Sequence, residues 1–321
     1  MGRYLLTRLA FALALVFVVS SAALLLTKLA PGDFATQQCV VLTVEECTAL
    51  REKLGLDRPF LEQYASWLSG ALRFDFGQSM LYSRPVSTLI GERAVNTAML
   101  ATIALLLATA IGIPLGIYSG TGRGVGRAMV RVISVVGLSV PPLIGSLALV
   151  FLAARTGWLP VGGMTSSAGI ELTWAQWLAD LARHLPLPAL ALAIPMAATL
   201  ERLQSEAIES AAHEPFVAAS RARGADRTRS ILRHAWPASL RPVLGLYGVI
   251  IGTLFSGSFV VEIVTSWPGL GQLMFNALKA RDLFLVAGCA ATGAFFLAAG
   301  TLISDLLLAY TDPRVKMGEQ A

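Results

Sequence analysis

The sequence predicts an all-α membrane protein with six transmembrane helices, and two observations support this prediction. Of its 321 residues, 55% are hydrophobic and only 14% are charged, and the mean hydropathy is +0.66. Soluble domains carry about 25% charged residues. A helix needs about 20 apolar residues to cross the hydrocarbon core of a bilayer. Six uncharged runs come close to or exceed that length: residues 9–27, 94–122, 132–154, 184–200, 242–261 and 283–304.

The first run is expected to be a retained membrane anchor within an N-terminal segment, residues 1–30. Arg3 and Arg8 precede it, as basic residues also precede the apolar core of a secretory signal peptide. The run has 19 residues, however, and residues 28–33 read KLAPGD rather than a small-residue cleavage site. Signal peptides have shorter apolar cores, of about 7–15 residues.

The segment 31–93 is the largest piece outside the runs, and it is too small for an independent domain. Thr43 and Glu46 form a capping box that predicts a helix to about residue 54. A second, amphipathic helix follows, whose apolar face must lie on the bilayer surface or on the membrane helices. That face comprises Phe60, Leu61, Tyr64, Trp67, Leu68 and Leu72.

Prolines and glycines predict irregularities in three of the runs. Gly112, Pro114 and Gly116 are expected to weaken the second helix, and residues 120–126 to form a tight loop. Pro141 and Pro142 are expected to kink the third helix, either for packing alone or to free carbonyl groups toward a cavity. The fourth run is the weakest prediction because it is short and holds three prolines. These are Pro186, Pro188 and Pro195.

The distribution of basic residues predicts that both termini are cytoplasmic. With that orientation the inner segments hold 14 Lys and Arg against eight acidic residues, and the outer segments hold 11 against 12. An excess of Lys and Arg marks the cytoplasmic side. The segment 31–93 then lies outside the cytoplasm, where a disulfide between Cys39 and Cys47 can persist; two free thiols are the alternative. Cys289, within the last run, is expected to be a packing residue.

Residues 206–242 form a basic connection between two runs. The positions of Pro, Gly and Asp residues within it predict two short helices. Pro215 suits the first helical position, and Gly224 is placed to end that helix. Asp226 can cap the second helix, and Pro237 is expected to stop it. The second helix is expected to carry an apolar and a polar face. The apolar face is Ile231, Leu232, Ala235 and Trp236, and the polar face is Arg227, Arg229, Ser230, Arg233 and His234.

This connection resembles the EAA loop of ABC importer permeases, in particular those of the dipeptide/oligopeptide/nickel family. The resemblance rests on residues 216–224, FVAASRARG, and on His234 after nine further residues. Ser220 stands where the family usually has Ala, and residues 236–238 read WPA where it usually has Leu-Arg-Asn. In that family the loop docks onto the ATPase subunit. The resemblance therefore implies a set of coupling residues: Phe216, Ala218, Ala219, Arg221, Arg223, Gly224 and His234.

Other stretches resemble the same family in the same order. They are GLDRP at residues 55–59, FDFGQS at 74–79 with Phe74 in place of the usual Gly, EIVTSWPGLG at 262–271, and the tail 305–316. A Pro-Gly break after the fifth run allows a surface or re-entrant helix over residues 272–280. The resemblance makes Glu262, Trp267, Pro268 and Gly269 candidates for an outer gate or pathway. The alternative for Trp267 is a plain interfacial anchor.

Several kinds of chemistry have no matching pattern in the sequence. The phosphate-binding motif G-x-x-x-x-G-K-[ST] does not occur. We expect no catalytic, cofactor-binding or metal-binding residues, because Ser, His, Asp and Cys lack the required spacings. The apolar composition also argues against nucleic-acid binding. Two other classes remain as alternatives to an importer subunit: an ion-coupled secondary carrier and a non-transport membrane scaffold.

The resemblance implies a type I ABC importer permease fold, with residues 94–321 as a core of five transmembrane helices that includes the loop 206–242. It further implies a multi-pass location in the bacterial inner membrane. Its partners would be a second, homologous permease, one or two ATPase subunits that hold ATP and Mg²⁺, and an extracytoplasmic binding protein. Peptides are the expected cargo, and nickel chelates, opines and glutathione are the alternatives.

Overall fold

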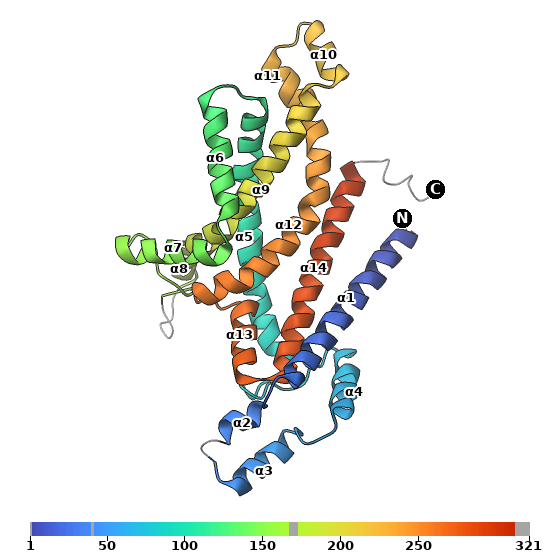
Figure 1. Cartoon of the computed structure of the whole chain (residues 1–321), viewed down its shortest axis with the longest axis vertical. Helices are drawn as coiled ribbons and strands as arrows, with labels where there is room; N and C mark the ends of the chain where they lie inside the picture. Colours follow the sequence, from blue (N-terminus) through green and yellow to red (C-terminus); the bar gives the residue numbers. More distant parts are fainter. Residues whose placement is uncertain (1, 40–41, 167–172, 312–321) are drawn as a thin grey trace. The chain divides into compact units, whose positions relative to one another are not determined.

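The computed structural model describes residues 2–39, 42–166 and 173–311, and within them it contains helices and no β-strand (Figure 1). The helices are α1 (Gly2–Leu29), α2 (Phe34–Gln38), α3 (Val44–Lys53), α4 (Phe60–Ala71), α5 (Val86–Thr121), α6 (Val125–Ser139), α7 (Pro142–Thr156), α8 (Trp174–His184), α9 (Pro186–Ala212), α10 (Pro215–Ala222), α11 (Arg227–Ser230), the π-helical turn η1 (Ile231–Ala235), α12 (Trp236–Val264), α13 (Leu270–Ala280) and α14 (Leu283–Thr311). Residues 312–316 of the family-like tail, with Arg314 and Lys316 of the charge count, lie outside the described residues.

The chain forms two compact units, each made of segments that are apart in the sequence. The first unit contains Met99–Trp267 and the described chain from Ala299 onward, and the second contains Gly2–Ala98 and Pro268–Ala298. Helices α5 and α14 each contribute to both units. The segment 31–93 shares a unit with the first helix.

Four helical segments are long and apolar enough to cross a membrane, and two bent helix pairs bring the number to six if each pair is one span. The pairs correspond to the third and fourth runs. Helices α6 and α7 meet at 102°, and α8 and α9 meet at 43°. The sharper break falls at the proline pair: Val140, which precedes Pro141, is extended, and Pro142 begins α7. A residue before proline avoids the helical region, so one helix ends and another begins there.

The expected weakening of the second run does not occur, because α5 continues through Pro114 as far as Thr121. Three glycines, four residues apart, instead let α9 approach closely. A Cβ atom added to Gly112 would lie 2.6 Å from the Ala197 carbonyl oxygen, and one added to Gly120 would lie 2.5 Å from that of Ser205. A Cβ atom added to Gly116, between these two glycines, would lie 2.6 Å from the Gln204 Cβ. Small residues at this spacing allow two helix backbones to pack in near contact.

In the second unit, α4 packs on membrane helices, as one of the two alternatives predicted. Trp67 is buried with Leu24 of α1 and Ala287 of α14, and the Tyr64 and Ser21 hydroxyl oxygens lie 2.8 Å apart. Leu61 and Leu72 were expected on this face but are exposed.

The segment before α4 is held by local contacts. The capping box of Thr43 and Glu46 opens α3 as predicted. A disulfide joins Cys39 to Cys47 with their Cα atoms 5.3 Å apart, and Cys289 is buried. The Arg51 guanidinium group pairs with Asp33 at 2.8 Å and with Asp57 at 3.0 Å, and these contacts draw α2, α3 and the following turn together.

Candidate coupling site

Helix α10 presents one exposed face and rests on a small core. It begins at Pro215 as predicted, and its buried residues are Val217 and Ser220. Val217 packs with Ile208 and Ala211 of α9 and with Ala235 of η1. All four predicted coupling residues on this helix are exposed: Phe216, Ala218, Ala219 and Arg221. A partner could therefore contact this helix without disturbing its core.

Gly224 ends α10 as predicted. Its φ is +90°, a left-handed conformation that glycine adopts readily. The Gly224 amide donates to the Arg221 carbonyl at 2.9 Å, and the Ala225 amide donates to the Ser220 carbonyl at 3.2 Å. This is the pair of bonds that closes a helix in a Schellman motif. Gly224 and Arg223 are both exposed beside the closed turn.

Asp226 caps α11 as predicted, because its carboxylate accepts a hydrogen bond from the Thr228 amide at 3.0 Å. Hydrogen bonds from backbone amides, that of Thr228 first, lower the pKa of the Asp226 carboxyl group. The cap is therefore charged at neutral pH. A lowered carboxyl pKa makes a contribution to stability that is complete above the ordinary pKa and is lost as the pH falls through the folded-state pKa.

The prediction that Pro237 stops the second helix is wrong. The helix continues from Arg227 to Val264 through the π-helical turn η1. There the Trp236 amide donates to the Ile231 carbonyl, five residues earlier, and Pro237 sits at the start of α12, where a missing N–H is tolerated. The additional residue per turn also rotates the predicted faces. Leu232 is 48% exposed, whereas Ser230 is buried with its hydroxyl 3.4 Å from that of Ser220.

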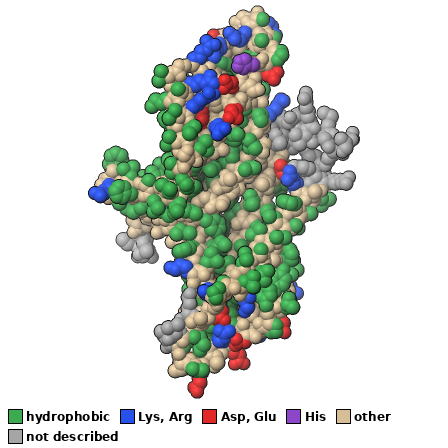
Figure 2. All heavy atoms as spheres, in the orientation of Figure 1, with side chains coloured by type: hydrophobic (Ala, Val, Ile, Leu, Met, Phe, Trp, Pro, Cys, Tyr) green, Lys and Arg blue, Asp and Glu red, His purple; other side chains and the backbone are tan. Residues whose placement is uncertain are grey.

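Basic side chains lie on and around the exposed face of α10. Arg221, Arg223, Arg229 and Arg233 are exposed, and His234 is half-buried in η1. Figure 2 shows blue side chains gathered where α10 and α11 lie. We define the exposed face of α10, with Arg223, Gly224 and His234, as the coupling surface. Its charge suits an acidic partner surface.

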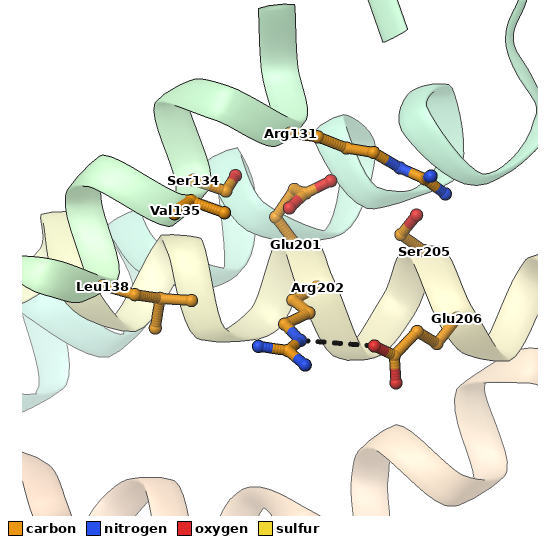
Figure 3. Close-up of a pocket in the computed structure, with 8 residues that line it drawn as sticks. All are labelled: Arg131, Ser134, Val135, Leu138, Glu201, Arg202, Ser205 and Glu206. Atoms are coloured by element: carbon orange, nitrogen blue, oxygen red, sulfur yellow. Dashed lines mark hydrogen bonds and ion pairs between the residues drawn. The ribbon is translucent and has the colours of Figure 1, made fainter. Parts of the chain in front are cut away.

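A polar seam between α6 and α9, which the sequence analysis did not identify, lies beneath this loop. Glu201 is only 2% exposed and accepts a hydrogen bond from the Ser119 hydroxyl. A cavity of about 320 Å³ opens beside it; Arg131 and Ser134 reach toward it from α6, and Glu201 and Ser205 from α9 (Figure 3). The sequence does carry a signal for this seam, because polar residues follow Glu201 at intervals of three and four residues. This pattern begins directly after the apolar run 184–200 ends, so the run itself does not include it.

The four candidates for an outer gate or pathway fall in different units. In the first unit, Glu262 and Trp267 are buried, and the Trp267 amide donates to the Glu262 carbonyl at 2.9 Å. Trp267 packs in an apolar core with Leu100 and Val261, unlike an exposed interfacial anchor. In the second unit, the Pro268 carbonyl accepts from the Asn96 side chain at 2.8 Å, and Gly269 precedes α13.

In the second unit, the family-like stretch 74–79 meets Asp282, which the sequence analysis did not single out as a site. The buried Asp282 carboxylate accepts hydrogen bonds from the Ser79 hydroxyl at 2.6 Å and from the Leu81 amide at 3.0 Å. It also accepts from the Leu285 amide at 3.2 Å, at the start of α14. Asp282 therefore ties residues 79–81 to the beginning of the last helix. Within the described ranges no group of three or more His, Cys, Asp or Glu side chains could hold a metal ion.

Comparisons with known proteins match the whole chain to transport proteins. A Brucella ovis protein named as a peptide permease is 32% identical over 323 residues, which cover 99% of this chain and 100% of that protein. The oligopeptide transport system permease protein AppB of Bacillus subtilis is 30% identical over 98% of this chain and 100% of its own. An inward-facing structure of the MetNI methionine ABC transporter matches with a TM-score of 0.54 and 17% identity, over 70% of this chain and 96% of that chain.

The fold and the sequence families agree with one another. The structural match shows the fold of a type I ABC importer permease. Residues 1–101 match the N-terminal family of binding-protein-dependent transport system membrane components. Residues 112–317 match the family described as the binding-protein-dependent transport system inner membrane component. The chain therefore belongs to this family of multi-pass inner-membrane transport proteins.

Proposed function

We propose that this chain, with a second homologous permease, forms the path by which peptides cross the membrane in an ATP-driven importer. The family supplies the transport role, and relatives matched over nearly their full length are named as peptide or oligopeptide permeases. Peptides are therefore preferred over nickel chelates, opines and glutathione. Cargo would arrive from an extracytoplasmic binding protein. An ion-coupled carrier or a scaffold has no comparable support.

The chain is a non-catalytic subunit, and one or two ATPase partners would hold ATP and Mg²⁺. The observation that carries this proposal is the coupling surface: α10 is exposed on one side, closed by Gly224 and anchored on α9 and η1 through Val217. ATP binding would draw two ATPase domains together and move the coupling surfaces of both permeases with them. Closure of the inner side and opening of the outer side would then be two states of one element.

Replacement of Gly224 by Asp tests the coupling surface. Aspartate is strained at a φ of +90° and adds an acidic group beside Arg221 and Arg223. No atom lies within 4 Å of an added Cβ, so the core of the loop should survive. We expect peptide uptake to be lost while the protein level in the membrane is unchanged.

Gly124→Asp is the matched control. Gly124 has a φ of +81°, also has no atom within 4 Å of an added Cβ, and lies in the loop before α6 rather than in the turn after α10. We expect this variant to keep uptake and to co-purify with the ATPase. Normal uptake by Gly224→Asp, or equal loss in both variants, would refute the coupling role of this turn.

A further inference from the structure

The polar seam between α6 and α9 holds two arginines and two glutamates whose charges are unevenly paired. The Glu209 carboxylate of α9 binds both arginines of α6, Arg127 at 2.8 Å and Arg131 at 2.9 Å. Glu201, on the same helix, is 2% exposed and forms no ion pair with any residue that the structure describes. It accepts a hydrogen bond from the Ser119 hydroxyl, which carries no charge. Burial of a carboxylate without a cationic partner is costly, so one glutamate holds two cations while the other lacks one.

Arg131 lies between these two glutamates along α9. Arg131, Glu201 and Ser205 line the same cavity of about 320 Å³, where Figure 3 shows all three side chains. Glu201, Ser205 and Glu209 follow one another at intervals of four residues, which places them on one face of α9. Each glutamate is therefore about 6 Å from Ser205 along the helix axis. A long side chain that starts opposite Ser205 has one carboxylate within reach on either side.

Two further features favour an exchange of partners by Arg131. The Ser205 hydroxyl is buried and has no hydrogen-bond partner among the described residues, so it offers an acceptor between the two carboxylates. Arg127 donates to both oxygens of Glu209, at 2.9 Å and 2.8 Å, and keeps that carboxylate paired when Arg131 leaves. Each glutamate would then hold one arginine.

The present arrangement has an opposing advantage in solvation. The Arg131 side chain is 46% exposed beside Glu209, whereas a bond to Glu201 would bury its charge. Desolvation of an arginine offsets much of what a buried ion pair gains. The two arrangements are therefore opposed by terms of similar kind, as a two-state element requires.

We propose that Arg131 is a positioning residue of the transport cycle and exchanges Glu209 for Glu201 as α9 moves against α6. The inference rests on the proposed function, because movement of the coupling surface would drive the exchange: α10 is seated on α9 through Val217. A bond between Arg131 and Glu201 would fill the cavity and draw α6 onto α9. ATP binding closes the inner side in the proposed function, so it should favour this arrangement. The contact between α6 and α9 would then have two discrete states.

Zero-length cross-linking identifies which glutamate the side chain at position 131 contacts. The variant Arg131→Lys keeps the charge, and a carbodiimide joins its amine to a carboxylate in contact, with loss of water. Mass spectrometry of the digested chain then identifies the partner. In the purified full-length chain alone, we expect cross-links to both glutamates, with Glu209 predominant. In the complex with the ATPase, a non-hydrolysable ATP analogue should raise the ratio of Glu201 to Glu209 cross-links roughly fivefold or more, the size of a typical coupling between sites.

Glu206→Gln is the matched control. Glu206 lines the same cavity but already pairs with Arg202 at 3.2 Å, and both side chains are 66% exposed. Its removal should leave the cross-links of the Arg131→Lys variant and their response to nucleotide unchanged.

A double-mutant cycle on peptide uptake provides a second measurement with the arginine removed. Arg131→Gln and Glu201→Gln should each slow uptake, and the double variant should be no slower than the slower single variant, because both remove one interaction. Arg131→Gln combined with Glu206→Gln should show no such coupling. Additive losses for Arg131 and Glu201 would contradict a shared role.

Three results of the cross-linking separate the proposal from its alternatives. Cross-links to Glu209 alone, in every nucleotide state, would overturn it. A constant share of Glu201 cross-links would also overturn it, because a pair that ignores nucleotide has no part in the cycle. A chain that shows both cross-links but binds no ATPase would keep the exchange of partners and count against the proposed function only.

Discussion

At the scale of single residues, two turns have left-handed backbones, one at a glycine and the other at a phenylalanine. Gly224 occupies its turn without strain, and the sequence predicted this because helix termination by glycine is a local rule. Phe74 has a φ of +61° although the resembling family usually has glycine at that position. Its side chain is 81% exposed and therefore gains little from burial. The sequence could flag the unusual residue, but only the backbone angle shows its consequence.

Phe74→Gly is expected to stabilise the protein. A left-handed conformation costs a non-glycine residue about 1–2 kcal/mol, and part of the gain is offset by the greater freedom of glycine in the unfolded chain. We expect a net gain of about 0.5–1 kcal/mol, measured as a higher melting temperature in detergent. Phe74→Ala keeps the strain while removing the same aromatic ring, so it should give no gain. Equal stabilisation by alanine would disprove the strain argument.

At the scale of elements, the sequence predicted starts and ends better than continuity. Pro215, Asp226 and the capping box at Thr43 all act within one helical turn, and the structure places each as predicted. Pro237 failed as a stop signal because the π-helical turn before it depends on packing of Ala235 and Trp236 against α9 and α10. Gly112 and Gly116 were read as weak points because their partner, α9, is about 80 residues away along the chain.

The glycine contact between α5 and α9 predicts a sharp difference between two substitutions in one helix. In Gly116→Ala the new Cβ would lie 2.6 Å from the Gln204 Cβ and 2.7 Å from the Glu201 carbonyl oxygen. Such overpacking costs about 1–3 kcal/mol, and we expect a lower melting temperature.

Gly91→Ala is the matched substitution, because nothing lies within 4 Å of its added Cβ. It should stabilise α5 slightly, since alanine is the better helix former. If both variants lost stability equally, the effect would belong to α5 itself and not to its contact with α9.

At the scale of the whole molecule, composition was sufficient for the fold class, and family-like motifs were sufficient for the transport role. The four continuous apolar helices were readable because each is a single run, and the two bent pairs are bent where prolines fall. The polar seam at Glu201 and the meeting of Ser79 with Asp282 could not be read, since both depend on which helices become neighbours. Orientation rests on the distribution of Lys and Arg.

Cysteine labelling in intact cells checks that orientation. Cys39 and Cys47 are bonded and Cys289 is buried, so the native chain should label weakly. A membrane-impermeant maleimide should label Leu61→Cys, at a position that is 76% exposed on α4, without permeabilisation. Arg229→Cys, in the connection 206–242, should label only after the membrane is opened. The reverse pattern would place this connection outside the cytoplasm and remove its access to an ATPase.

The unbroken helix from Arg227 to Val264 has a mechanical consequence. Its 38 residues have a contour length of about 57 Å at 1.5 Å per residue, and the helix bends along its path instead of forming a straight rod (Figure 1). It contains the π-helical turn η1 near one end and Pro242 in its interior. A push on α11 would still be carried along one continuous backbone to Val264, which lies next to the buried Glu262 and Trp267 in the sequence. Movement of the motor would therefore reach the far side of the bilayer along a single helix, without a relay of separate segments.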